Sequence, residues 1–317
     1  MTMVKHWTAA ILLATLLFAC GDSGGGNGGS APPPGLGDDS FDLGSAVTLM
    51  QLCLESYQML TDFEDGQTFT LPAPYTLQAQ FLTEEHYDGE GFDGKVPIAF
   101  VATSGSAIYV VFRGTKTISE WISDATLSQV DYTYVAGGGK TETGFTTVYE
   151  SIRLPIIQEV NALASASGYT SLYITGHSLG GALTIVSAPD LAAQTPFAQP
   201  IVYSFAGPRA GDPIFAALYD GAIKNSWRVV NTYDEAPKVP PEITVVIGPA
   251  PDFKQEFFFY EHVDGEYDIT FGGPIRSVDD LIFNHSSCNY FATLCGQTSD
   301  PTQCEQAGQG LNGCSFS

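Results

Sequence analysis

One short run of residues constrains the fold of this chain more than any other. The apolar stretch 172–175 leads directly into Gly-His-Ser-Leu-Gly-Gly at 176–181, and a second apolar segment, 182–186, follows. A serine held between a buried strand and a helix needs small neighbours, because larger side chains there would collide with the strand and the helix. The pattern therefore predicts a buried strand, a strained turn at Ser178 and a helix that begins at that turn.

A helix that begins at a serine is suited to acyl transfer. Its first backbone N–H groups are unpaired, and together with the positive end of the helix dipole they point to where an oxyanion would form. The pattern Gly-x-Ser-x-Gly is short enough to occur by chance in a turn, but the strand and helix around it supply the context that the motif requires. Pro189 is expected to kink this helix or to end it early.

The first forty residues predict an export signal and a tether. Residues 1–19 carry Lys5, an apolar core and a small-residue exit, which is typical of a secretory signal and too short to span a membrane. Cys20 follows as in a bacterial lipobox, so we expect either a lipidated Cys20 that holds the protein in the bacterial cell envelope or simple cleavage and secretion. The Gly/Ser/Pro-rich segment 20–40 predicts a flexible tether, and residues 41–317 a single folded domain.

The charge balance favours a neutral substrate. Twelve Lys and Arg stand against 35 Asp and Glu, a formal net charge of -23, so the protein should repel nucleic acid and anionic bilayers at low salt. The acidic residues are scattered through loops without a metal-binding spacing, so we expect neither a metal nor a cofactor. We expect a monomer whose partner is a lipid or another ester at an interface, with membrane contact through a lipid anchor at Cys20.

Cysteines cluster at the end of the chain. Four of the six lie in the last thirty residues, namely Cys288, Cys295, Cys304 and Cys314. In an exported chain this clustering predicts disulfide bonds that hold the C-terminal tail, and three pairings are open. Cys53 lies among apolar residues at helical spacing and is expected to be a buried thiol.

Helix and strand patterns alternate along the folded part. The expected helices are 45–59, 145–166 with an interruption at Pro155, and 213–220; the expected strands are 97–102, 107–113, 172–175, 201–205, 227–233 and 267–271. Such alternation predicts an α/β fold with a mainly parallel sheet and helices on both of its faces.

A serine hydroxyl becomes a nucleophile at neutral pH when a histidine takes its proton and a carboxylate orients that histidine. In α/β-hydrolases both partners follow the serine in the chain, the acid first. Asp234 comes at the end of the expected strand 227–233, at the sheet edge where loops carry function. This placement favours Asp234 over its neighbour Glu235 as the acid.

Two of the five histidines are placed to act as the base. Of the others, one leaves with the signal, one precedes the serine, and one lies inside the turn and is explained by packing; these are His6, His86 and His177. His262 precedes the expected strand 267–271, whereas His285 follows it on a loop. Loop placement after the last strand favours His285.

The oxyanion needs a second donor besides the N–H of Leu179. Thr115 follows a buried strand at a turn and can offer its N–H and its hydroxyl. Directly after it, Ile118, Trp121 and Ile122 recur at the spacing of a short amphipathic helix. Its apolar face either packs on the core or, beside an active site, forms a lid that opens at a lipid surface.

Several blocks of the sequence resemble the class 3 lipases, which include fungal-type triacylglycerol lipases and feruloyl esterases. The blocks are 111–115, 118–124, 144–145 with Tyr149, 175–182, 205–213, 231–234 and 239–241. The resemblance implies an α/β-hydrolase fold with a short helical lid around Ile118, Trp121 and Ile122. It also implies the following site residues: Ser178 as nucleophile, Asp234 as acid, His285 as base, Thr115 and Leu179 as oxyanion donors, and His262 as a structural histidine.

We therefore expect an exported serine hydrolase that cleaves the carboxylic esters of lipids, a triacylglycerol lipase, through an acyl-enzyme. A feruloyl or other carboxylesterase on the same fold is the alternative, and a rate jump at an emulsion surface would distinguish the two. A tethered surface lipoprotein that binds lipid without turnover is a third hypothesis. The presence of serine, acid and histidine in the required order argues against it.

Overall fold

The computed structural model describes residues 41–83, 94–115, 128–166, 168–247, 254–308, 310–311 and 314. These residues all belong to one compact unit. The predicted signal, the tether with Cys20, and the predicted lid with Ile118, Trp121 and Ile122 lie outside the described residues. No helix within the described ranges is long and apolar enough to cross a membrane.

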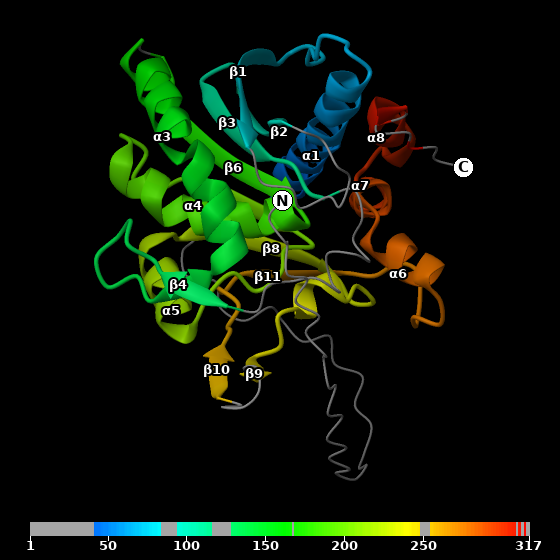
Figure 1. The fold of residues 1–317 in the computed structure, drawn as a ribbon. Helices are drawn as coiled ribbons and strands as arrows, with labels where there is room; N and C mark the ends of the chain where they lie inside the picture. Colours follow the sequence, from blue (N-terminus) through cyan, green and yellow to red (C-terminus); the bar gives the residue numbers. More distant parts are fainter. Residues whose placement is uncertain are drawn as a thin grey trace, which may run out of the picture. The chain divides into compact units, whose positions relative to one another are not determined.

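A seven-stranded sheet of order β1-β2-β3-β6-β7-β8-β11 forms the middle of this unit (Figure 1). The strands are β1 (Thr76–Thr83), β2 (Val96–Ser104), β3 (Ala107–Phe112), β6 (Ser171–His177), β7 (Ile201–Phe205), β8 (Asn225–Asn231) and β11 (Glu266–Ile269). The pairs β1–β2 and β2–β3 are antiparallel, and every pair from β3 to β11 is parallel. The predicted, mainly parallel sheet is confirmed.

Helices cover both faces of this sheet, because its central strands carry apolar side chains on both sides. Val110 packs into a core with α3 (Thr143–Ser165), α4 (Leu179–Gln194) and α5 (Pro213–Ala222). Its neighbour Val111 points to the opposite face. There it packs into a second core with α1 (Leu43–Glu64) and α7 (Ser287–Gly296).

The smaller elements lie around this framework. They are β4 (Gln129–Asp131) paired with β5 (Lys140–Glu142), the 3₁₀ turn η1 (Ala236–Lys238), β9 (Ile243–Ile247) paired with β10 (Gln255–Phe259), and the helices α6 (Val278–His285) and α8 (Pro301–Gly308). All of them except the β4–β5 pair come from the part of the chain that follows β8.

Two prolines do not end the helices that contain them. α4 continues past Pro189 to Gln194, and α3 continues past Pro155 to Ser165. The residues of α4 from Leu179 to Leu191 are all buried, so packing of the turns beyond Pro189 offsets the lost backbone hydrogen bond. Pro155 lies on the exposed side of α3, where the freed carbonyl can be hydrated.

Disulfide bonds hold the C-terminal tail, as predicted. Cys288 is bonded to Cys314, and Cys295 to Cys304, so both bridges start on α7. Cys53 is a free thiol buried in the second core, and burial raises its pKa to about 12. Since a thiol of this kind stays protonated, Cys53 contributes to packing and not to nucleophilic chemistry.

Candidate active site

Ser178 occupies the strained turn that the sequence predicts. Its φ of 61° and ψ of -125° lie outside the regions that a residue with a side chain normally adopts. The backbone around it fixes the turn: Ser178 N donates to Phe205 O at 2.9 Å, and Gly181 N donates to Ser178 O at 2.8 Å. The serine therefore stands between the end of β6 and the first turn of α4.

The glycines beside Ser178 are required by close backbone approach. A Cβ on Gly176 would overlap the carbonyl oxygen of Gly180, and a Cβ on Gly180 would overlap the carbonyl oxygen of Phe112. Backbone atoms of a buried helix or a central strand cannot move away as the end of a side chain can. These contacts explain why small residues flank the serine on both sides.

Asp234 and His285 form a buried pair. His285 Nδ1 lies 2.8 Å from Asp234 Oδ2, and the side chains of both residues are almost completely inaccessible to solvent. Because an ionised carboxylate only accepts hydrogen bonds, the proton of this bond is on Nδ1, which leaves the lone pair of the imidazole on Nε2. Asp234 Oδ1 also accepts the N–H of Ala236 at 2.9 Å, so the carboxylate is held at both oxygens.

His285 is the last residue of α6, and the prediction that it lies on a loop is therefore wrong in this detail. The helix begins at a serine cap, where Ser277 Oγ accepts the N–H of Asp280 at 3.2 Å. It has only eight residues, too few for its periodicity to stand out in the sequence. The helix ends at the residue that faces Asp234, so its last turn aims the imidazole at the carboxylate.

Four buried polar atoms on Ser178 and the segments around it have no hydrogen-bond partner among the described residues. They are Ser178 Oγ, His285 Nε2, Thr115 Oγ1 and His177 Nε2. The ring of His177, next to Ser178 in the chain, lies 4.8 Å from the ring of His285. Buried polar atoms are normally paired, so a cluster of unpaired ones is typical of a site that is built for a ligand. Catalytic hydrogen bonds also often tighten only once substrate is bound.

Thr115 reaches the same place from the end of β3. A Cβ on Gly114 would lie only 3.0 Å from Ser178 Cβ, so the turn after β3 passes directly beside the serine. Arg113 holds this turn, because its guanidinium donates to Pro97 O at 2.9 Å and to Gly114 O at 2.6 Å. Leu179, the other predicted oxyanion donor, is the first residue of α4, where backbone N–H groups have no partner within the helix.

Tyr57 and His177 are partners that the sequence does not reveal. The hydroxyl of Tyr57 on α1 lies 2.8 Å from His177 Nδ1. His177 is buried as predicted, and burial, assisted by the nearby His285, lowers its pKa well below its ordinary value. The ring is therefore neutral. It packs against the rings of His285 and Tyr290, so it contributes to holding the imidazole of His285 in place.

Tyr290 on α7 completes the surroundings of the carboxylate. Its hydroxyl donates to Asp234 Oδ2 at 2.9 Å and accepts the N–H of Asn231 at 2.8 Å. Burial, together with the charge of Asp234, raises the pKa of Tyr290 well above its ordinary value, so the hydroxyl keeps its proton and remains a donor. Asn231 Nδ2 in turn donates to Asn284 O at 2.9 Å, which ties the end of β8 to the residue before His285.

His262 takes the structural position that the resemblance implies. Its Nε2 lies 2.6 Å from Pro237 O, and burial lowers its pKa well below the ordinary value, so the neutral ring donates this hydrogen bond. Pro237 belongs to η1, the turn directly after Asp234. The histidine therefore supports the segment that follows the acid and does not reach the serine.

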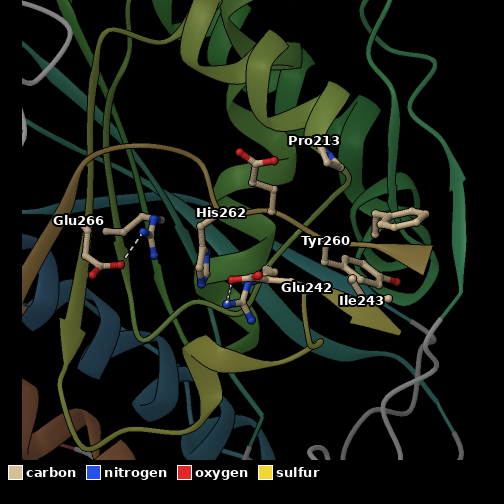
Figure 2. Close-up of a pocket in the computed structure, with 10 residues that line it drawn as sticks. Pro213, Glu242, Ile243, Tyr260, His262 and Glu266 are labelled. Carbon is tan, nitrogen blue, oxygen red and sulfur yellow. Dashed lines mark hydrogen bonds and ion pairs between the residues drawn. The ribbon is translucent and has the colours of Figure 1, made fainter. Parts of the chain in front are cut away.

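A separate cavity of about 600 Å³ lies beside His262 (Figure 2). It is lined by Arg209, Pro213, Arg228, Glu242, Ile243, Phe259, Tyr260, Glu261, His262 and Glu266. Arg228 is paired with Glu266 at 2.7 Å, so part of its charge is neutralised there. None of Ser178, Asp234 and His285 lines this cavity. Within the described ranges, no group of three or more His, Cys, Asp or Glu is arranged to hold a metal ion.

Comparison with known proteins agrees with this geometry. The family model described as lipase (class 3) matches residues 109–244, the segment from β3 through Ser178 and Asp234 to the start of β9. A lipase of Rhizopus niveus is 33% identical over 168 residues, which cover 47% of this chain and 42% of that protein. Secreted mono- and diacylglycerol lipase A of Penicillium cyclopium is 30% identical over 167 residues, 53% of this chain and 49% of that protein.

Residues 109–244 thus match the class 3 lipase family, and the chain is similar to fungal lipases over about half of its length. Among solved structures, the triacylglyceride lipase of Rhizomucor miehei superimposes with a TM-score of 0.58 and 26% identity, over 72% of this chain and 80% of that one. The fold is accordingly that of an α/β-hydrolase, as the sequence predicts. The chain spans about half the length, or slightly less, of the curated relatives it matches.

Proposed function

We propose that this protein is a class 3 lipase that hydrolyses the carboxylic ester bonds of lipids, with Ser178 as nucleophile, His285 as base and Asp234 as acid. The observation that carries the proposal is the buried Asp234–His285 hydrogen bond beside a serine on a strained turn, with Ser178 Oγ and His285 Nε2 both unpaired. A solved structure that resembles this chain at 26% identity is a triacylglycerol lipase whose catalytic centre is a serine protease triad.

The reaction follows from the hydrogen-bond pattern. His285 Nε2 carries the lone pair, so it accepts the proton of Ser178 Oγ as that oxygen attacks the ester carbonyl carbon. Asp234 stabilises the positive imidazole through Nδ1–H. The alcohol leaves with the proton from Nε2, and a water activated at the same nitrogen then releases the acid from the acyl-enzyme.

The N–H of Leu179, with the N–H and hydroxyl of Thr115, would stabilise the oxyanion of the tetrahedral intermediate. Leu179 begins α4, so the positive end of the helix dipole adds to its N–H. The unpaired, buried hydroxyl of Thr115 supports this assignment, because a hydroxyl of a purely structural threonine would be expected to have a partner.

Long or medium acyl esters, with triacylglycerols first, are the substrates that we propose. Relatives from Penicillium and Fusarium are named mono- and diacylglycerol lipases, and a relative from Oryza sativa is named a phospholipase A1. The formal charge of -23 favours an uncharged ester over an anionic one. We retain the helix with Ile118, Trp121 and Ile122 as a proposed lid over the serine.

Export is part of the proposal. Relatives from Penicillium and Fusarium are named secreted lipases, and two disulfide bonds suit an oxidising compartment. A lipid anchor at Cys20 remains the finer proposal. Mass spectrometry of the mature N-terminus tests it: a diacylglycerol on Cys20 supports the anchor, and an unmodified N-terminus beyond residue 19 contradicts it.

Substitution of the nucleophile tests the catalytic proposal. Ser178→Ala should abolish hydrolysis of emulsified tributyrin and of soluble p-nitrophenyl butyrate, whereas Ser187→Ala, a change at another buried serine on α4, should retain most of it. Activity of Ser178→Ala above about one thousandth of the parent's would overturn the assignment of the nucleophile. If the rate does not increase when the ester concentration exceeds its solubility limit and an emulsion forms, the result would favour a carboxylesterase instead.

A further inference from the structure

The β9–β10 hairpin exposes an apolar face. Its register places Ile243 opposite Phe259 and Val245 opposite Phe257, so the four side chains point to the same side of this two-stranded sheet. Their exposed fractions are 62%, 49%, 46% and 56% in that order. Single exposed hydrophobic residues are common on protein surfaces, but four adjacent ones on one sheet face are not.

The other face and the ends of the hairpin hold it in place. Thr244 points away from the apolar face and is buried, and its hydroxyl donates to Pro241 O at 3.2 Å. Gln129 on β4 donates from Nε2 to Phe259 O at 2.7 Å, and Tyr260 N donates to Glu242 O at 2.9 Å. The hairpin is therefore fixed to the body of the protein, and its apolar face is presented without a partner among the described residues.

Most of the hairpin lies outside the segment that matches the family model. The family model ends at residue 244, the second residue of β9, and the rest of the hairpin lies beyond it. Among the described residues, no hydrogen bond joins Ser178, Asp234 or His285 to this hairpin. A separate purpose for it is therefore open.

We propose that Ile243, Val245, Phe257 and Phe259 form a docking face for an uncharged lipid surface, such as a triacylglycerol droplet. This inference rests on the proposed lipase function. The face carries no charged side chain, since Glu256 pairs with Val246 on the opposite side. With a formal charge of -23 on the whole chain, an uncharged surface is the apolar surface that the protein can approach without repulsion.

The area of the face argues against a second copy of the chain as its occupant. Two strands of five residues cover about 17 Å by 10 Å, or about 170 Å², from the usual rise and strand spacing. A stable dimer buries about 800 Å² on each partner. A lipid surface has no such minimum, because each apolar side chain that enters it contributes on its own.

The charged cavity at the base of the hairpin limits how deep the contact can go. Ile243 and Phe259 also line the cavity of Figure 2, whose remaining wall includes Glu242, Glu261 and Arg209. Charged groups of this kind stay in water. The hairpin face would therefore enter the lipid only as far as these two residues.

Binding can be measured without turnover in the full chain carrying Ser178→Ala. Its partition onto a trioleoylglycerol emulsion, measured by flotation, is compared with that of the same chain carrying Phe257→Ser and Phe259→Ser. The control is Leu154→Ser, since Leu154 lies on α3 and is 55% exposed, close to the exposure of Phe257. We expect the hairpin variant to lose about tenfold or more in partition coefficient and the control to change less than twofold.

Two further measurements keep the inference distinct from the proposed function. In the chain with Ser178 intact, the hairpin variant should lose trioleoylglycerol hydrolysis relative to soluble ester hydrolysis, and Val245→Asp should do the same if the double variant does not fold. Failure of the parent to cleave any ester would overturn the proposed function. The binding assay would still be informative, because it involves no turnover. Equal partition of hairpin variant and parent, or a parent dimer that the hairpin variant dissociates, would overturn the docking face.

Discussion

Replacing Asp234 by asparagine tests how the proposed base is oriented. The carboxylate accepts three hydrogen bonds: from Ala236 N at Oδ1, and from His285 Nδ1 and the Tyr290 hydroxyl at Oδ2. An amide has one oxygen, so in either orientation its NH₂ group faces at least one of these donors. The variant that keeps the bond to Ala236 must turn the NH₂ group towards His285.

An NH₂ group beside His285 reverses the imidazole tautomer. Nδ1 becomes the acceptor and Nε2 carries the proton, so Nε2 can no longer take the proton of Ser178. We expect kcat on a soluble ester to fall by about 10⁴, equivalent to about 5.5 kcal/mol of transition-state stabilisation. The fold should be retained, because the amide has nearly the shape of the carboxylate.

The assay is the steady-state hydrolysis of p-nitrophenyl butyrate at neutral pH, with Glu235→Gln as the control. Glu235 is the neighbouring carboxylate and forms an exposed ion pair with Lys238, so its replacement should change kcat by less than about threefold. A loss of less than tenfold in Asp234→Asn, in a folded protein, would refute the assigned orientation of His285.

Three further predictions follow from the same contacts. Thr115→Val should lower kcat by about a hundredfold and Thr115→Ser should restore most of it; an equal, small effect of both would leave only backbone donors at the oxyanion. Tyr290→Phe leaves the N–H of Asn231 unpaired and should lower the free energy of unfolding in urea by about 2 kcal/mol, whereas no change would contradict the hydrogen bonds assigned to the hydroxyl. Burial, with the charge of Asp62, raises the pKa of Glu55 to about 7 in the folded protein. The unfolded chain therefore releases this proton at lower pH than the folded one, and the free energy of unfolding should fall as the pH rises from about 4.5 to about 7. Glu55→Gln should therefore stabilise the protein at pH 8 relative to the parent more than at pH 5, and an equal effect at both pH values would show that burial does not shift Glu55.

The features that could be predicted from the sequence are those whose cause is local. The turn at Ser178 is encoded by the glycines and the apolar strand beside it, and the structure shows why larger residues would collide there. Asp234 could be selected because parallel strands bring their carboxyl ends to one edge. Chain order and position after the last strand led to His285, although its short helix was missed.

The features that could not be predicted depend on contacts across the fold. Tyr57 meets His177 across 120 positions, and Tyr290 meets Asp234 across 56, and nothing near either tyrosine distinguishes it from an ordinary core residue. That α4 continues past Pro189 could not be predicted for a related reason, since packing on all sides holds the helix around it. The hairpin β9–β10 has an apolar pattern in strands that are exposed, which is the reverse of what burial would predict.

Reaction of the intact chain with a fluorophosphonate, followed by peptide mass spectrometry, tests the central claim most directly. The account predicts a single covalent adduct on Ser178 Oγ, formed rapidly in the parent and at least about a thousandfold more slowly in His285→Ala. An adduct on another serine, or equal labelling rates in the parent and His285→Ala, would contradict it.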